Sequence, residues 1–189
     1  MPYAAASGRL PLQRLLGVYL DTASDDIVLA DTAHGRPELD GAHRNALRFN
    51  WSHSGGRALV AIARSVQPGI DLEYRLRRNA RDVLALAQRF FAPQEALALA
   101  ALPTEQQGVA FLRLWTIKEA VLKAEGRGLA YGLHRVVVDL GAPVPTLELV
   151  GDAAPAAWQA RELSFDPDWL AAIAWRGPAL QVRWCGEWP

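Results

Sequence analysis

The sequence has little of what marks disulfide-rich, zinc-binding, secreted or membrane proteins. Cys185 is the single cysteine among 189 residues, so it cannot form an internal disulfide, and the four histidines suggest no Cys/His cluster. No apolar run is long enough to cross a bilayer, and the start of the chain lacks the basic-then-apolar order of a signal peptide. We expect a cytoplasmic protein with no membrane partner.

An excess of charge of one sign is also missing. Lys and Arg number 20, and Asp and Glu number 20, which gives a formal net charge of zero. Because nucleic-acid-binding proteins usually carry a basic excess, we expect no nucleic-acid partner. Apolar residues, in contrast, make up 51% of the chain. This is enough for one domain of ordinary size or for two small lobes that share a core.

Helical and strand-like periodicities both occur along the chain, and together they predict an α+β fold. Helices are predicted at residues 9–20, 80–90, 94–102 and 111–129. Strands, punctuated by glycine and proline, are predicted at residues 27–30, 47–54, 57–64, 70–73, 134–140, 146–150, 158–163, 169–175 and 180–184. We place an N-terminal lobe at residues 1–68 and a C-terminal lobe at residues 69–189.

The predicted helix at residues 111–129 has clear boundary signals and an unusual set of charges. Residues 104–107 match a capping box upstream of it, and residues 126–128 contain glycines that can form a left-handed C-cap. Apolar side chains cover two faces, which predicts burial on both sides. Glu119 and Lys123 are four residues apart and project to one side. They form either an ordinary ion pair on a solvated surface or a pair that faces an ionic ligand.

A second group of charges lies in a short predicted strand, where Asp71 and Glu73 point to the same face. Two carboxylates about 6.5 Å apart repel by roughly 2–3 kcal/mol at an effective dielectric constant of about 20. On a solvated face screening removes most of this cost. In a cleft a divalent cation would remove it, and Mg²⁺ suits few carboxylates together with water and phosphate oxygens. Glu119 would be a natural third carboxylate.

Several basic residues are candidates to neutralise phosphate charge at such a site. They are Lys118, Lys123, Arg36, Arg9 and His53. For His53, at the end of a strand beside a glycine turn, two interpretations stay open. It is either a turn histidine bonded to backbone or, with Ser52, a donor to a phosphate.

Four motifs, in this order, resemble those of one enzyme family: HGRP at 34–37, FNWSHS at 49–54, GIDLE at 69–73 and WTIKEAVLKAEGRGL at 115–129. The family's versions are Gly-Lys-Pro, Asn-x-Ser-His-Ser, Gly-[IV]-Asp-[IV]-Glu and Trp-x-x-Lys-Glu-Ala-x-x-Lys-x-x-Gly-x-Gly-Leu. It is the 4′-phosphopantetheinyl transferase family, in the larger pseudo-dimeric form that activates the peptide and polyketide synthases of secondary metabolism.

The resemblance implies two similar lobes with small antiparallel sheets and packed helices, related by a pseudo-twofold axis, with coenzyme A in the cleft between them. It implies an abbreviated N-terminal lobe, because members typically have a further strand and helix before the helix that begins here near Arg9. It also implies transfer of 4′-phosphopantetheine to a serine of an acyl or peptidyl carrier protein, with release of adenosine 3′,5′-bisphosphate. The pseudo-dimeric form suggests a monomer.

The resemblance also implies roles for individual residues. Asp71, Glu73 and Glu119 would hold Mg²⁺, and Glu119 would take the serine proton directly or through a metal-bound water. Lys123 would neutralise phosphate oxygens. The remaining contacts to coenzyme A would come from Arg9, Ser52 and His53 at the 3′-phosphate and from Gly35, Arg36 and Pro37 at the adenine. The basic connector at 74–81 would dock an acidic helix of the carrier protein.

Two other functions are compatible with the same residues. One is a magnesium-dependent phosphohydrolase that acts on a nucleotide through the three carboxylates. The other is a non-catalytic module that binds coenzyme A or a carrier protein, an alternative motivated by the abbreviated N-terminal lobe.

Overall fold

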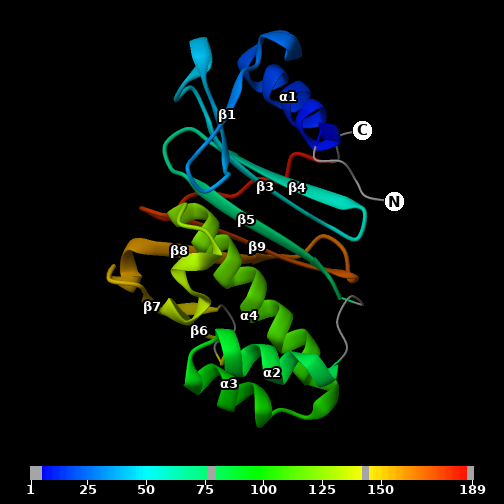
Figure 1. The fold of residues 1–189 in the computed structure, drawn as a ribbon, viewed down its shortest axis with the longest axis vertical. Coiled ribbons are helices and arrows are strands. Elements are labelled where there is room, and N and C mark those ends of the chain that lie inside the picture. The colour runs from blue at the N-terminus through cyan, green and yellow to red at the C-terminus, as the bar shows by residue number, and fades with distance from the viewer. Residues whose placement is uncertain (1–5, 76–79, 142–144, 187–189) are drawn as a thin grey trace.

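Figure 1 shows the fold in a computed structural model, which describes residues 6–75, 80–141 and 145–186. The helices of this part are α1 (Ala6–Leu20), α2 (Ala80–Phe90), α3 (Pro93–Ala100) and α4 (Thr104–Glu125). The strands are β1 (Leu29–Asp31), β2 (Pro37–Leu39), β3 (Arg48–Ser54), β4 (Arg57–Ala63), β5 (Pro68–Tyr74), β6 (Val136–Asp139), β7 (Thr146–Val150), β8 (Trp158–Leu163) and β9 (Trp169–Arg176). They form antiparallel sheets in the orders β1–β2, β3–β4, β5–β9–β8 and β6–β7. The expected α+β class is confirmed.

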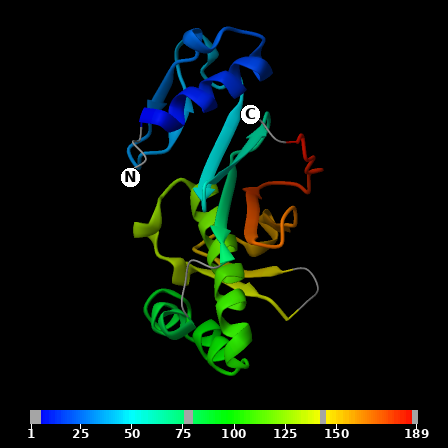
Figure 2. The same ribbon diagram turned by 90° about the vertical axis from the view of Figure 1, so that its right-hand side faces the viewer.

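The N-terminal elements form a small core of their own. Its buried side chains are Leu12, Leu16, Ile27, Leu39, Leu47 and Phe49. Figure 2 shows these elements at one end of the molecule, with the β3–β4 hairpin extending from them. The hairpin forms as predicted and turns at Gly55 and Gly56, which both have positive φ. β1 starts two residues later than the strand predicted at 27–30, because residues 24–26 form a 3₁₀ turn.

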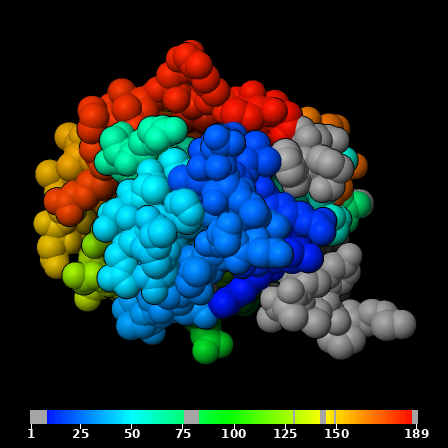
Figure 3. Space-filling model, turned by 90° about the horizontal axis from the view of Figure 1, so that it is seen from above, coloured from blue at the N-terminus to red at the C-terminus, as the bar shows by residue number. Residues whose placement is uncertain are grey.

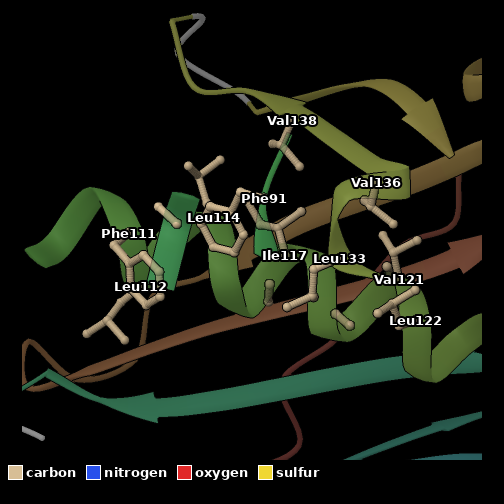
Figure 4. Close-up of a cluster of buried hydrophobic side chains, with 14 of the residues drawn as sticks. Phe91, Phe111, Leu112, Leu114, Ile117, Val121, Leu122, Leu133, Val136 and Val138 are labelled. Atoms are coloured by element: carbon tan, nitrogen blue, oxygen red, sulfur yellow. The ribbon is translucent and has the colours of Figure 1, made fainter. Parts of the chain in front are cut away.

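The larger core surrounds α4, which is buried on two sides as its sequence predicts. One side packs against β5 and β9, and another packs against α2, α3 and β6. Figure 4 shows part of this cluster, in which the rings of Phe91 and Phe111 stack with their centroids 5.0 Å apart. No helix in the described ranges is long and apolar enough to cross a bilayer.

The start of α4 differs from the predicted capping box. The N-cap residue is Pro103, and Thr104 is already the first helical residue and makes no side-chain cap. Gln107 turns back instead and donates from Nε2 to the carbonyl oxygen of Leu102 at 2.9 Å. At the other end α4 stops at Glu125, short of the predicted boundary at residue 129, but the predicted glycine C-cap is confirmed at Gly126, which has a φ of 79°.

The prediction of a strand at residues 180–184 is wrong. Residues 179–186 have no regular secondary structure and pair with no strand of the described part. Side chains hold the segment instead: Trp184 stacks on Phe165 with ring centroids 5.5 Å apart. Cys185 lies near Tyr19 of α1 and raises the pKa of that tyrosine. Figure 3 shows this C-terminal segment (red) beside the N-terminal elements (blue).

Lys118 is a structural residue and not the phosphate partner that its sequence position suggested. It is fully buried, and its ammonium group contacts Glu95 of α3 at 2.6 Å. The same group donates to the carbonyl oxygens of Leu133 and Val136. Burial lowers the pKa of Lys118, and the Glu95 carboxylate opposes that shift. Lys118 therefore links α3, α4 and the segment before β6.

β5 lies very close to α4, and residue 69 must be glycine for this reason. A Cβ atom on Gly69 would lie 1.9 Å from the carbonyl oxygen of Ala120 and 2.4 Å from the backbone nitrogen of Ala124. Both atoms belong to the helix backbone and cannot move alone. The close approach brings Asp71, two residues further along β5, into contact with Lys123 of α4.

We predict that Gly69→Ala lowers the free energy of unfolding by about 3 kcal/mol or more, because α4 or β5 has to shift. Urea denaturation followed by circular dichroism measures this loss. Gly108→Ala is the matched control within α4, since a Cβ there meets nothing within 4 Å. Its better helix propensity should raise stability by up to about 1 kcal/mol. A Gly69→Ala protein as stable as the wild type would refute the close-approach argument.

Candidate active site

β3 lies along the free edge of β5 and is joined to it through side chains. Three buried side chains of β3 accept hydrogen bonds from backbone N–H groups of β5: Asn50 Oδ1 from Ile70 (2.9 Å), Ser52 Oγ from Leu72 (3.3 Å) and Ser54 Oγ from Tyr74 (3.1 Å). We call these three residues the side-chain ladder. Because the other edge of β5 pairs with β9, the ladder satisfies donors that would otherwise be unpaired in the interior.

The two serines of the ladder also orient the acidic pair of β5. Ser52 donates to Asp71 Oδ1 at 2.9 Å, and Ser54 donates to Glu73 Oε2 at 3.4 Å. Each hydroxyl therefore accepts from one β5 residue and donates to the carboxylate of the residue before it. The sequence indicated that Asp71 and Glu73 share a face, and the ladder fixes that face toward β3.

Lys123 of α4 completes this arrangement. Its ammonium group lies 2.7 Å from Asp71 Oδ1, 3.0 Å from Ser52 Oγ and 3.1 Å from the carbonyl oxygen of Ile70. The ion pair of Lys123 is thus with Asp71 and not with Glu119. Of the two interpretations that the sequence left open for the helix charges, the ordinary surface pair is wrong.

Glu119 lies beside this group and is almost completely buried, with an exposed fraction of 9%. Its pKa is raised to about 7, mainly by loss of solvation and also by the negative charges of Asp71 and Glu73, while Lys123 opposes the shift. Burial also raises the pKa of Asp71, against the effects of Lys123 and Ser52. The carboxylates are therefore close enough to resist ionising together.

Two carboxylate oxygens at this site lack a hydrogen-bond donor. Asp71 Oδ2 and Glu119 Oε1 are buried, and neither finds a partner among the described residues. Buried, unsatisfied carboxylate oxygens suit a hard cation such as Mg²⁺ or a bound proton. In the described ranges, however, no three His, Cys, Asp or Glu side chains are grouped closely enough to hold a metal ion. Asp71 and Glu119 fit a cation, and the third ligand stays a prediction.

Other residues that the sequence brought forward lie away from this group. His53 is exposed, because it alternates with the buried Ser52 along β3, and its ring centroid is 5.4 Å from that of Trp51. Arg9 of α1 is exposed and forms an ion pair with Asp31. Gly35, with a φ of 77°, lies in the turn of the β1–β2 hairpin. The connector predicted at 74–81 includes residues 76–79, which lie outside the described residues.

Arg36 reaches the site from the same turn but does so through the backbone of α4. Its guanidinium group donates to the carbonyl oxygen of Lys123 at 3.1 Å. Pro37 follows as the first residue of β2. Sequence reasoning missed this contact and the roles of Asn50 and Ser54. The polar residues that alternate along residues 50–54 were the available signal for the ladder, while nothing in the sequence linked Arg36 to α4.

Fold and site together define an α+β protein with a buried carboxylate and lysine site between a helix and two strands. A model of the 4′-phosphopantetheinyl transferase superfamily matches residues 67–174. The chain is 40% identical over 178 residues to the 4′-phosphopantetheinyl transferase HetI of a Nostoc species, which covers 94% of this chain and 72% of HetI. The chain belongs to the 4′-phosphopantetheinyl transferase superfamily, as its four motifs suggested.

Two further relatives extend the comparison. The chain is 32% identical over 157 residues to the 4′-phosphopantetheinyl transferase psf-1 of Bacillus pumilus, covering 82% of this chain and 63% of that protein. Among solved structures, the holo-[acyl-carrier-protein] synthase of Thermotoga maritima matches 59% of this chain and 63% of its own, with a TM-score of 0.47 and 18% identity.

The raised pKa of Glu119 predicts how stability depends on pH. Folding raises this pKa from 4.5 to about 7, so the folded state binds more protons than the unfolded state between these values. The free energy of unfolding should therefore fall as pH rises through this window, by up to about 3 kcal/mol from this residue. Glu119→Gln removes the titration and should flatten the fall between pH 5 and pH 8.

Urea denaturation at several pH values measures this difference. Glu125→Gln is the control, because Glu125 is on the same helix and faces Arg127 instead of the site. It should keep the slope of the wild type. Parallel stability curves for Glu119→Gln and the wild type would show that Glu119 ionises normally in the folded protein.

Proposed function

We propose that this protein transfers 4′-phosphopantetheine from coenzyme A to a serine of an apo acyl or peptidyl carrier protein. The observation that supports it best is the combination of two unsatisfied buried carboxylate oxygens with one ammonium group, Lys123. A pyrophosphate needs cationic groups on its oxygens, and a serine nucleophile needs a proton acceptor. This site offers both, and membership of the superfamily provides the reaction class.

In the proposed reaction the carrier serine Oγ attacks the phosphorus atom that bears the pantetheine group. A phosphodiester bond to serine forms, the pyrophosphate P–O bond breaks, and adenosine 3′,5′-bisphosphate leaves with the bridging oxygen. The proton of the serine goes to Glu119. Glu119 suits this role because its carboxylate is buried beside Lys123 and one of its oxygens has no hydrogen-bond donor among the described residues.

Lys123 would hold the phosphate oxygens in the same step. Its side chain is partly exposed, unlike that of Asp71. Its three N–H donors are directed at Asp71, Ser52 and the carbonyl oxygen of Ile70, so we expect a phosphate oxygen to replace one of these acceptors. Lysine contacts phosphate as a point charge and needs no fixed bidentate geometry. We expect Arg9 and His53 to contribute at the 3′-phosphate end. Ser52, which the sequence also suggested there, has its hydroxyl engaged by Asp71, Leu72 and Lys123 instead.

We also propose that Mg²⁺ is required, held by Asp71 and Glu119 with Glu73 as the third carboxylate. When bound, the ion would neutralise charge on the pyrophosphate and on the leaving group. The two unsatisfied oxygens of Asp71 and Glu119 support this proposal.

The direct test is mass spectrometry of an apo carrier protein incubated with this protein, coenzyme A and Mg²⁺. We expect a mass gain of one phosphopantetheine group on the serine, together with free adenosine 3′,5′-bisphosphate. Release of inorganic phosphate without a carrier protein would identify a nucleotide phosphohydrolase instead. Binding of coenzyme A with neither product would identify a non-catalytic module.

Variants of the site give a quantitative prediction. Glu119→Gln should lower kcat about 10²- to 10⁴-fold, the range typical for loss of a general base. Asp71→Ala should lower activity and shift its magnesium dependence to higher concentrations. Glu125→Gln, six residues further along α4, should leave kcat within about twofold of the wild type, in line with the usual effect of a substitution away from the site. Full activity of Glu119→Gln would exclude its role as base.

A further inference from the structure

Arg36 connects the N-terminal hairpin to the end of α4 across 87 residues of sequence. Its Nη1 atom donates to the carbonyl oxygen of Lys123 at 3.1 Å, and its side chain is 19% exposed. The backbone of Arg36 is itself fixed, because its N–H donates to Thr32 Oγ1 and its carbonyl oxygen accepts from the Thr32 N–H. The guanidinium group therefore extends from a rigid turn to one defined helix residue.

A second nitrogen of the guanidinium group also donates to the protein. Nη2 of Arg36 donates to Glu38 Oε1 at 2.6 Å, which orients the group within the β1–β2 hairpin. Nε is buried and has no acceptor among the described residues. Each terminal nitrogen already donates one of its two N–H groups to the protein, so the fork that binds phosphate is directed at Lys123 and Glu38. This geometry is that of a structural contact and not of an open anion site.

The end of α4 has room for the Arg36 guanidinium group because residue 126 is a glycine. A Cβ atom on Gly126 would lie 2.6 Å from Nη1 of Arg36, and Gly126 has a φ of 79°. Glycine is thus required at this position for its left-handed conformation and for the space it leaves. The last carbonyl groups of a helix lack intrahelical partners and carry partial negative charge, so a cation is favoured there.

Lys123 is consequently held from two directions. Its carbonyl oxygen is bound by Arg36, and its ammonium group is bound by Asp71, Ser52 and the carbonyl oxygen of Ile70. We propose that Arg36 is a positioning residue: it clamps the last turn of α4 and so fixes the ammonium group of Lys123, and it does not bind a phosphate of coenzyme A. Its kinetic consequences rest on the proposed transfer reaction.

Kinetics distinguish a clamp from a phosphate ligand. Arg36→Ala should lower kcat about 10- to 100-fold, because a misplacement of about 1 Å can cost that much. The dissociation constant for coenzyme A, measured by calorimetry, should change less than threefold. Arg36→Lys should recover most of kcat, since an ammonium group can still donate to the carbonyl oxygen of Lys123. A Kd raised tenfold with kcat unchanged would show that Arg36 is a phosphate ligand and overturn the proposal.

Arg44→Ala is the matched control. Arg44 is also an arginine of the N-terminal elements and forms an ion pair with Asp40, but it is exposed. It should leave kcat and the dissociation constant unchanged. A loss of kcat in Arg44→Ala equal to that in Arg36→Ala would indicate a general effect of positive charge and would count against the clamp.

A double-mutant cycle tests the contact itself. Gly126→Ala displaces the guanidinium group, so it should lower kcat in the wild-type background by more than it does in the Arg36→Ala background. Equal factors in both backgrounds would mean that Gly126 and Arg36 act independently, which contradicts the clamp.

Hydrogen exchange tests the clamp without any assay of transfer. The Gly126 N–H donates to the carbonyl oxygen of Leu122 in the last turn of α4, and its exchange should be about tenfold faster in Arg36→Ala but unchanged in Arg44→Ala. Unchanged exchange in Arg36→Ala would overturn the proposal. If the wild type proves inactive as a transferase, the proposed function fails while this measurement still decides whether Arg36 holds α4.

Discussion

The ion pair between Lys123 and Asp71 is the contact on which the site depends. It joins α4 to β5, and Ser52 of β3 hydrogen-bonds to both partners. Charge-assisted hydrogen bonds of this kind contribute about 1.5–3 kcal/mol each, and removing one partner of a buried pair typically costs about 3–5 kcal/mol. Because three elements meet at this pair, the helix, the strand and the hairpin cannot shift independently.

This arrangement carries an electrostatic cost that the fold leaves partly uncompensated. Asp71 and Glu119 are both buried, and the pKa of each is raised. Sites of this kind store unfavourable interactions that the surrounding packing tolerates, and such strain concentrates where ligands bind. The surrounding packing is tight: Gly69 lets β5 approach the backbone of α4, and Lys118 with Glu95 ties the far side of the helix to α3. The rigid scaffold thus holds the carboxylates close together despite their mutual repulsion.

The sequence allowed much of the fold to be predicted, because local signals were strong. The β3–β4 hairpin follows from alternation around Gly55–Gly56, and the end of α4 follows from Gly126. The acidic pair and Lys123 were also recognisable from spacing and motif. The strand expected at 180–184 was wrong because alternation alone cannot show whether a partner strand is present.

The interaction partners of the charged side chains were much harder to predict from the sequence than the positions of the helices and strands that carry them. Lys118 and Lys123 are the same residue type and lie on the same helix, yet Lys118 pairs with Glu95 in the core and Lys123 pairs with Asp71 at the site. Which face of a doubly buried helix meets which neighbour depends on contacts far apart in sequence. The same holds for Arg36, whose residue type suits phosphate and backbone carbonyl oxygens equally well.

The side-chain ladder has a consequence for how the chain finds its register. Parallel neighbours such as β3 and β5, when joined by backbone groups, can slip by two residues with little change in hydrogen bonding. Here a two-residue slip would put Asn50 opposite Leu72, where the shorter Ser52 fits, and would leave the Ile70 N–H without its acceptor. Because Asn50 is longer than Ser52 and Ser54, the three side chains can satisfy the backbone N–H groups of β5 in only one register. The lengths of those three side chains therefore determine how the acidic residues of β5 are aligned with β3.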